Sequence, residues 1–277
     1  MLCVSPMSVQ RPNGKGPKDR VTVPCGRCYA CKAKRQEDWS LRLMQEFKAS
    51  KNAYFVTLTY SDENIPWAND LPSLCKRDIQ LFIKKVRKVG KIRYFIVGEY
   101  GDKTARPHYH GIIFNVPGIN KENSTEVIAD KWNKGHILLG AVNEASIRYT
   151  TKYCLKSMDD VSDVEKGFML CSRKPGIGYN YLSDSVIKYH DAHLSNFNMV
   201  LPGGIKKPMP RYYRHKIWSE KQRKEQSEAF VKMSDEKINE EIKKSQDKNE
   251  NYFFDLVNRF EKNVQIKINR KKQNSKL

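Results

Sequence analysis

The spacing of hydrophobic residues changes along the chain between the two-residue period of strands and the longer period of helices. Residues 54–60 (YFVTLTY) are rich in β-branched and aromatic residues and end in a polar run, which predicts a strand. Residues 32–50 and 76–89 carry apolar side chains three and four positions apart, which predicts two amphipathic helices. Gly90 is expected to end the second of them.

A β-hairpin is predicted near the middle of the chain. Residues 93–100 (RYFIVGEY) and 108–116 (HYHGIIFNV) have the composition of strands, and a short polar loop separates them. Pro107 is compatible with the start of the second strand, where no ladder donor is yet needed. A helix over 121–133 and a strand over 135–142 are expected to follow.

A further helix should begin at Asn143 or Ser146, because side-chain oxygens of these types cap helix N-termini. The order strand, helix, hairpin, helix, strand, helix implies an α+β fold in which helices flank a central antiparallel sheet. Pro, Gly and Lys are frequent in residues 1–24, which we expect to form an extended arm. We divide the chain into a basic N-terminal arm with a Cys-rich helix (1–50), a core (51–160), a basic Tyr/Gly-rich extension (161–215) and a charged helical C-terminal region (216–277).

Charge and hydropathy restrict the class of protein. The 277 residues carry a formal net charge of +20, and their mean hydropathy is −0.71. Residues 216–277 hold 16 Lys/Arg and 11 Asp/Glu, so a net charge of +15 belongs to the first 215 residues. An excess of this size predicts a polyanionic partner. No run approaches about 18 apolar residues and no signal peptide is visible at the N-terminus, so we expect a cytoplasmic protein without membrane contact.

Two histidines in the predicted hairpin are candidate metal ligands. Side chains in a strand alternate between the two faces of the sheet, so His108 and His110 point to one face and Tyr109 to the other. Hairpin geometry can bring Glu99 alongside them. Two imidazoles and one carboxylate suit Mn²⁺ or Mg²⁺ and leave positions for phosphate oxygens. The alternative is an incidental pair in an apolar strand, and zinc hydrolysis is less favoured because the third-ligand spacing of zinc helix motifs is missing.

Two tyrosines in the following helix are candidate nucleophiles. Tyr149 and Tyr153 are four residues apart, so they share a helix face about 6 Å apart along the axis. The ordinary pKa of tyrosine is about 10, and a cation such as Lys152 can offset it by stabilising the phenolate or the transition state. Attack on DNA would give a phosphotyrosyl ester that can be resealed without ATP. The alternative is a stripe of packed or surface tyrosines.

Three cysteines form a CxxCxxC motif. Cys25, Cys28 and Cys31 could open a zinc or iron–sulfur site, although both generally need four protein ligands. A ferredoxin-like run would place its fourth cysteine where Arg35 stands. A structural zinc completed by a distant Cys or His, a site shared with a partner, and three simple thiols all remain open. The seven cysteines of a cytoplasmic chain argue against a disulfide framework.

Several of these motifs together resemble a known family. They are FVTLTY at 55–60, GEYG at 98–101, RPHYHGIIF at 106–114 and YTTKYCLK at 149–156. The combination resembles the HUH endonucleases that initiate rolling-circle replication, and most of all the initiators of microviruses, in particular the gokushoviruses. PCGRCYACK at 24–32 and RKPGIGYNYL at 173–182 are similar to the same phage family. The resemblance covers roughly residues 24–215.

The resemblance implies an HUH endonuclease domain with a ferredoxin/RRM-like palm. It implies the following roles: metal ligands His108, His110 and Glu99; alternating nucleophiles Tyr149 and Tyr153; and the motif lysine Lys152. The implied reaction nicks single-stranded origin DNA, links the protein to the 5′ phosphate and later rejoins the circle in the cytoplasm of the bacterial host. A host helicase and polymerase are the implied partners, since the chain has no GxxxxGK[ST] loop of its own.

Two other classes of function remain to be separated. One is an HUH transposase or relaxase, although transposases usually use one tyrosine and relaxases often place theirs before the histidines. The other is a non-catalytic single-stranded DNA-binding protein, in which tyrosines stack on bases.

Overall fold

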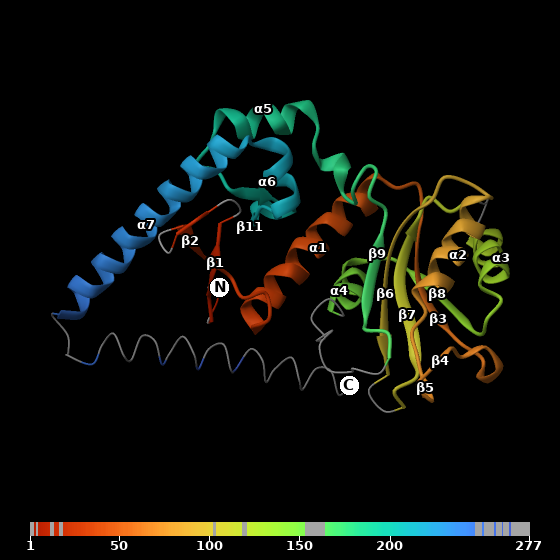
Figure 1. Cartoon of the computed structure of the whole chain (residues 1–277). Coiled ribbons are helices and arrows are strands. Elements are labelled where there is room, and N and C mark those ends of the chain that lie inside the picture. Colours follow the sequence, from red (N-terminus) through yellow and green to blue (C-terminus); the bar gives the residue numbers. More distant parts are fainter. Residues whose placement is uncertain are drawn as a thin grey trace. The chain divides into compact units, whose positions relative to one another are not determined.

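The computed structural model in Figure 1 describes most of the chain. It covers residues 3, 5–11, 14–16, 19–101, 104–117, 121–152 and 164–246, together with residues 251, 258, 262 and 266. The chain forms two compact units, residues 1–186 and residues 187–277. None of the described helices is both long and apolar enough to cross a membrane.

A five-stranded antiparallel sheet forms the centre of the first unit, in the strand order β8-β3-β7-β6-β9. The strands are β3 (Ala53–Thr59), β6 (Arg93–Tyr100), β7 (Pro107–Phe114), β8 (Ile137–Ala141) and β9 (Phe168–Cys171). The predicted α+β class with an antiparallel sheet is therefore confirmed, as are the strands expected before residue 143. The edge strand β9 was not predicted, because its four residues show no alternation of polar and apolar side chains.

One face of the sheet is covered by α2 (Lys76–Arg87) and α3 (Lys121–Trp132), which lie together on one side in Figure 1. The apolar side chains of α2 fall three and four positions apart and are buried, as the sequence predicted. They pack against the residues of β3, β6 and β7 whose side chains point to this face. The members of this core include Val56, Leu58, Ile79, Phe82, Ile83, Ile96, Tyr109, Ile113, Ile128 and Trp132.

The opposite face is covered by α1 (Tyr29–Ala49) and α4 (Glu144–Lys152). A second core lies here and consists of Leu43, Phe95, Val97, Ile112, Phe114, Val142, Ile147 and Ile177. Ser40 of α1 and Thr151 of α4 join the two helices by a buried hydrogen bond of 2.8 Å. Asn143 caps α4 as predicted, because its Oδ1 accepts from the N–H of Ser146 at 2.9 Å and the Ser146 hydroxyl accepts from the N–H of Asn143.

A buried ion pair fixes α1 against the sheet edge. Glu46 of α1 forms a salt bridge with Arg93 at the start of β6, and its second oxygen accepts a 2.7 Å hydrogen bond from the backbone N–H of Gly178. Arg93 also donates to the carbonyls of Pro175 and Gly176 at 3.0 Å. Because a buried carboxylate is costly without partners, this network ties the segment after β9 to the helix.

Short elements complete the first unit. The described residues of the N-terminal segment, where the sequence predicted an extended arm, pair with each other as β1 (Met7–Gln10) and β2 (Arg20–Val23). A second small hairpin consists of β4 (Trp67–Ala68) and β5 (Leu71–Pro72). Short 3₁₀ turns lie at Asp62–Asn64, Tyr179–Tyr181 and, in the second unit, Pro202–Gly204.

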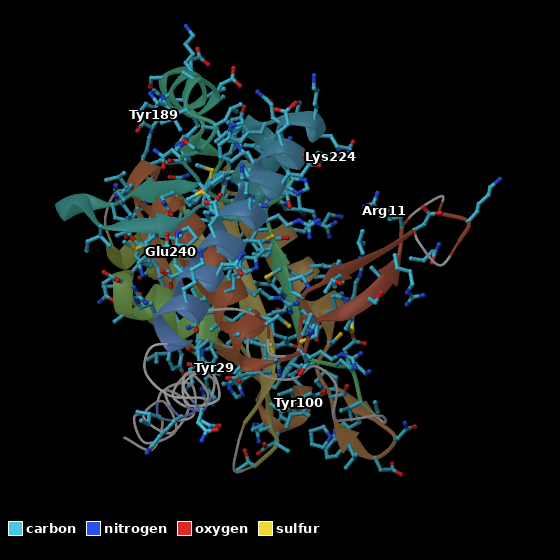
Figure 2. All side chains as sticks on the ribbon, turned by 90° about the vertical axis from the view of Figure 1, so that its left-hand side faces the viewer. Arg11, Tyr29, Tyr100, Tyr189, Lys224 and Glu240 are labelled. Carbon is cyan, nitrogen blue, oxygen red and sulfur yellow. The ribbon has the colours of Figure 1, made fainter. Side chains whose placement is uncertain are left out.

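The second unit is mainly helical among its described residues. Its elements are α5 (Asp184–Ala192), which begins just before the boundary, β10 (Asn198–Val200), β11 (Lys206–Pro208), α6 (Arg211–Ile217) and α7 (Glu220–Gln246). Trp218 is buried, and its indole N–H donates to the carbonyl of His190 at 3.1 Å. The helix predicted beyond residue 216 is confirmed in α7, which carries charged side chains such as those of Lys224 and Glu240 in Figure 2.

Candidate functional site

The histidine pair lies on the face of the sheet that α1 and α4 cover. His108 stands opposite Glu99 of β6 on one side and Thr59 of β3 on the other. His110 stands two residues further along β7, opposite Thr57. Directly opposed residues on neighbouring strands have side chains close enough to interact, so the antiparallel register brings the carboxylate beside the imidazoles. The structure thus brings together the three residues that the sequence suggested as ligands.

The three side chains converge on one point. The Nε2 atoms of His108 and His110 lie 3.0 and 3.3 Å from the same carboxylate oxygen of Glu99. One nitrogen from each histidine and one oxygen from the glutamate all lie within 4.8 Å of one another. Glu99 and His110 are buried, whereas His108 is half-buried. This Glu-His-His cluster could therefore hold one small cation that is reached from the His108 side.

Contacts behind the imidazoles orient their Nε2 atoms. The Nδ1 atom of His108 lies 3.0 Å from the carbonyl oxygen of Arg106, which can only accept, so Nδ1 carries the hydrogen and Nε2 presents a lone pair. The Nδ1 atom of His110 is hydrogen-bonded to the hydroxyl of Thr57 at 2.9 Å. Lone pairs that face a carboxylate repel it unless a positive charge lies between them. The donor set therefore fits a divalent metal ion, and protonation of the imidazoles is the alternative.

Thr57 was not identified from the sequence, although it lies in the quoted FVTLTY motif. Its signal is its position, since a threonine that shares a sheet face with a ligand histidine can bond the far side of the ring. The Arg106 carbonyl is also fixed in place. The Arg106 guanidinium donates to Asp62 Oδ1 at 2.6 Å and to the carbonyl of Tyr60 at 2.7 Å. The same Arg106 carbonyl accepts from the N–H of Gly101 at 3.0 Å.

Tyr149 lies next to the cluster. Its ring is 5.3 Å from that of His110 and 5.8 Å from that of Phe55, both in edge-to-face geometry. Its side chain is 43% exposed, so its hydroxyl end can be reached by a large substrate. Lys152 is the last residue of α4 and is exposed. Tyr153, the second candidate nucleophile, lies outside the described residues.

The packing of α4 explains this placement of Tyr149. Ile147 is buried in the second core, and Thr150 and Thr151 are also buried. Thr151 anchors the helix to α1, so the helix cannot rotate without breaking a buried hydrogen bond. With those residues facing inward, the intervening Tyr149 is directed along the sheet toward His110.

The tyrosines on the other face have a different environment. The hydroxyls of Tyr60 and Tyr109 are 2.8 Å apart, and Tyr60 donates to Asp78 Oδ2 at 2.9 Å. The N–H of Cys75 donates to the Tyr109 hydroxyl at 2.8 Å. Burial is the main reason that the pKa values of Tyr60 and Tyr109 are well above their usual range. These phenols stay protonated inside the core and are unsuited to attack a substrate.

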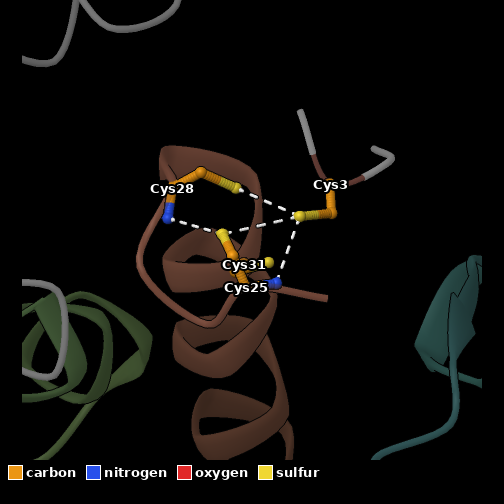
Figure 3. A group of neighbouring side chains, drawn as sticks. All are labelled: Cys3, Cys25, Cys28 and Cys31. Carbon is orange, nitrogen blue, oxygen red and sulfur yellow. Dashed lines mark hydrogen bonds between the residues drawn. The ribbon is translucent and has the colours of Figure 1, made fainter. Parts of the chain in front are cut away.

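The cysteine motif gains a fourth member in the structure. Cys25, Cys28 and Cys31 lie around the start of α1, and Cys3 meets them from the segment before β1, as Figure 3 shows. The sequence left open whether a distant Cys or His completes this group. Cys3 was not named, because a single cysteine near the N-terminus carries no spacing signal that links it to the motif.

Comparison with known proteins gives a consistent result. The family model for the replication-associated protein ORF2 matches residues 53–158, a range that contains the Glu-His-His cluster and Tyr149. Replication-associated protein VP4 of Bdellovibrio phage phiMH2K is 31% identical over 244 residues, which cover 78% of this chain and 74% of that protein. Replication-associated protein ORF2 of Spiroplasma virus 4 is 33% identical over 187 residues, with coverages of 59% and 58%. Replication-associated protein ORF4 of Chlamydia phage 1 is 24% identical over 215 residues, with coverages of 69% and 52%.

Proposed function

Because the chain belongs to the family of phage replication-associated proteins, we propose that it initiates rolling-circle replication by nicking single-stranded DNA at an origin. The observation that carries the proposal is the position of Tyr149. This exposed phenol lies beside His110, on the same sheet face as a Glu-His-His cluster. A nucleophile and a cation site can then reach a single phosphate.

The cluster is the proposed site of Mg²⁺ or Mn²⁺. Glu99, His108 and His110 would hold the ion, with Thr57 and the Arg106 carbonyl orienting the rings from behind. When bound, such an ion acts as a Lewis acid on a phosphate oxygen. The strands keep these ligands in place before DNA arrives, so little reorganisation is needed during the reaction.

The proposed chemical step is a transesterification. The phenol oxygen of Tyr149 or Tyr153 bonds to phosphorus, and the bond from phosphorus to the 3′ oxygen breaks. The phenol gives up its proton, and the leaving 3′ oxygen takes one to become a hydroxyl that can prime synthesis. The protein is left joined to the 5′ phosphate. Lys152 lies one residue before Tyr153, and its charge favours the phenolate and the anionic phosphate.

The second tyrosine would complete the cycle. One phosphodiester bond is exchanged for one phosphotyrosyl bond at each step, so the linkage can be passed on and resealed without ATP. Tyr149 and Tyr153 are separated by one helical turn, which suits alternate attack by two phenols at one metal site. The unit-length strand would be cut by the second tyrosine and closed into a circle as the first tyrosine is released.

Charge and partners fit this role. The net charge of +15 on the first 215 residues provides sequence-independent affinity for the DNA backbone. Since the sequence has no phosphate-binding loop of a helicase, we propose that a host helicase and polymerase extend the 3′ hydroxyl. The protein would work in the cytoplasm of the bacterial host.

The test is formation of a covalent adduct. The full chain is incubated with Mn²⁺ and a tiled set of labelled single-stranded oligonucleotides from the genome that encodes it, and products are separated on a denaturing gel. We expect an adduct on the oligonucleotides that contain the origin. Tyr149→Phe or Tyr153→Phe alone should leave some adduct, and the double variant should leave none.

The matched control is Tyr179→Phe, because Tyr179 is 44% exposed and so resembles Tyr149 in accessibility. This variant should keep full adduct formation. Cleavage by the double variant would refute the nucleophile assignment. DNA binding without any adduct would favour the non-catalytic binding protein, and loss of all adduct with one substitution would favour a single-tyrosine enzyme of the transposase or relaxase kind.

A further inference from the structure

Four cysteine side chains point toward one another beside the first turn of α1 (Figure 3). Cys3 precedes β1, Cys25 follows β2, and Cys28 and Cys31 belong to the start of α1. Their sulfurs lie within 4.8 Å of one another, although 22 residues separate Cys3 from Cys25. Nothing in the proposed nicking reaction uses this four-cysteine cluster, which stands apart from the Glu-His-His cluster in sequence and in chemistry.

The spacing of the sulfurs matches a single tetrahedral ion. The Cys3 sulfur lies 3.5 Å from that of Cys25 and 3.8 Å from that of Cys28. A zinc ion with four thiolates has Zn–S distances of about 2.3 Å, which places the sulfurs about 3.8 Å apart at the corners of a tetrahedron. A disulfide would need about 2.05 Å, and the described cysteines form none. An iron–sulfur cluster would separate the cysteine sulfurs more widely, since several atoms lie between them.

Backbone donors support thiolates in this position. The N–H of Cys28 donates to the Cys25 sulfur, and the N–H of Cys25 donates to the Cys3 sulfur, each at 3.3 Å. Hydrogen bonds of this kind stabilise negative charge on sulfur and hold the ligands in their orientation.

The N-terminal hairpin has little else to stabilise it. β1 and β2 each have four residues, and no residue of either strand is buried. An isolated two-stranded hairpin is marginal in water at best, since it buries too little apolar surface to offset its lost entropy. Cys3 and Cys25 flank the paired strands at their open end, next to the Met7–Val23 pair. A metal bound there would close the hairpin and fasten it to α1 in one step.

We propose that Cys3, Cys25, Cys28 and Cys31 form a structural zinc site that holds the N-terminal hairpin onto α1. Tetrathiolate coordination with all four positions filled by protein leaves no place for a substrate, which is the character of a structural site. Binding energy at such a site acts directly as folding energy for the segment that it closes.

The first test measures zinc in the purified full chain by elemental analysis. We expect one zinc per chain in the wild type, and the same in His108→Ala/His110→Ala, which removes the other candidate metal site. Cys3→Ser and Cys28→Ser should each lose most of the zinc. The matched control is Cys75→Ser, which changes a cysteine outside the cluster and should keep the full amount.

A second measurement does not depend on variants that could fold poorly. The wild-type chain is stripped of metal and titrated with Co²⁺, which gives intense visible absorption when four thiolates bind it tetrahedrally. We expect one equivalent to saturate this signal and Zn²⁺ to displace it. In parallel, chelation should increase tryptic cleavage after Arg11 or Arg20 by at least about tenfold, since the hairpin loses its closure. Zinc that survives Cys3→Ser undiminished, a zinc-free chain, or iron in its place would each overturn the proposal.

Discussion

The two faces of the central sheet place the same amino acid in opposite circumstances. On the face covered by α2 and α3, Tyr60 and Tyr109 are buried, share a hydrogen bond and have raised pKa values. On the face covered by α1 and α4, Tyr149 is 43% exposed and contacts His110. The comparison teaches that environment decides the chemistry of a phenol: one group of tyrosines stabilises the fold, and Tyr149 is left accessible to react.

The largest effect is expected from removing the charge of the Glu-His-His cluster. Glu99→Gln keeps the shape of the side chain and removes its anionic ligand, so we expect the adduct yield to fall by about 10³-fold. Binding of single-stranded DNA, measured by fluorescence anisotropy, should weaken less than about threefold, because backbone charges elsewhere dominate affinity. Normal adduct formation in this variant would show that the cluster has no part in the chemistry.

The next effect is on stability and concerns the opposite face. Tyr109→Phe removes the hydroxyl that bonds Tyr60 and the N–H of Cys75, and we expect a loss of about 1–3 kcal/mol in the free energy of unfolding. Adduct formation by the folded variant should be unchanged. Tyr149→Phe is the matched change, and its unfolding free energy should stay within about 0.5 kcal/mol of wild type. Urea denaturation measures both, and equal losses would erase the contrast between the faces.

A smaller effect is expected from the contact behind His110. Thr57→Val is nearly isosteric and removes the hydroxyl at 2.9 Å from Nδ1, so we expect Mn²⁺ to bind about tenfold more weakly. Thr57→Ser keeps the hydroxyl and should restore most of the affinity. Titration of adduct formation against Mn²⁺ measures the change. An unaltered midpoint in the valine variant would mean that the strand alone orients His110.

The smallest effect follows from the buried phenols and depends on pH. Because the folded-state pKa values of Tyr60 and Tyr109 are raised, the folded chain holds protons that the unfolded chain releases above about pH 10. Their stabilising contribution is fully present below that pH and is lost as pH rises. Each should cost about 0.4 kcal/mol at pH 10 and about 1.4 kcal/mol more per further unit. Tyr109→Phe should lessen the slope of unfolding free energy against pH, and an identical slope would contradict the burial argument.

Local pattern and local geometry explain which parts of the molecule could be predicted. Strand alternation was enough to place His108 and His110 on one face, and the short hairpin was enough to place Glu99 beside them. Hairpin pairing involves neighbours in the chain, so few alternatives compete with it. The predicted cap at Asn143 is equally local.

Contacts between distant segments could not be predicted in the same way. β9 pairs with β6 only after a long intervening stretch of chain, and its four residues fit many edges equally well. Cys3 joins Cys25 through tertiary folding of the hairpin, which no spacing rule encodes. Thr57 acquires its contact with His110 from the register of β3 against β7, and sequence alone does not fix that register.

The pleat of β7 also makes the length of this strand as restrictive as its composition. One codon inserted or deleted between Pro107 and Gly111 would turn both imidazoles into the packed interior and the ring of Tyr109 out toward solvent. Two added codons would preserve the sides but slide the histidines away from the position opposite Glu99. Frame-preserving insertions and deletions are therefore a route of variation that this strand cannot use, because each would damage the interior or the cation site.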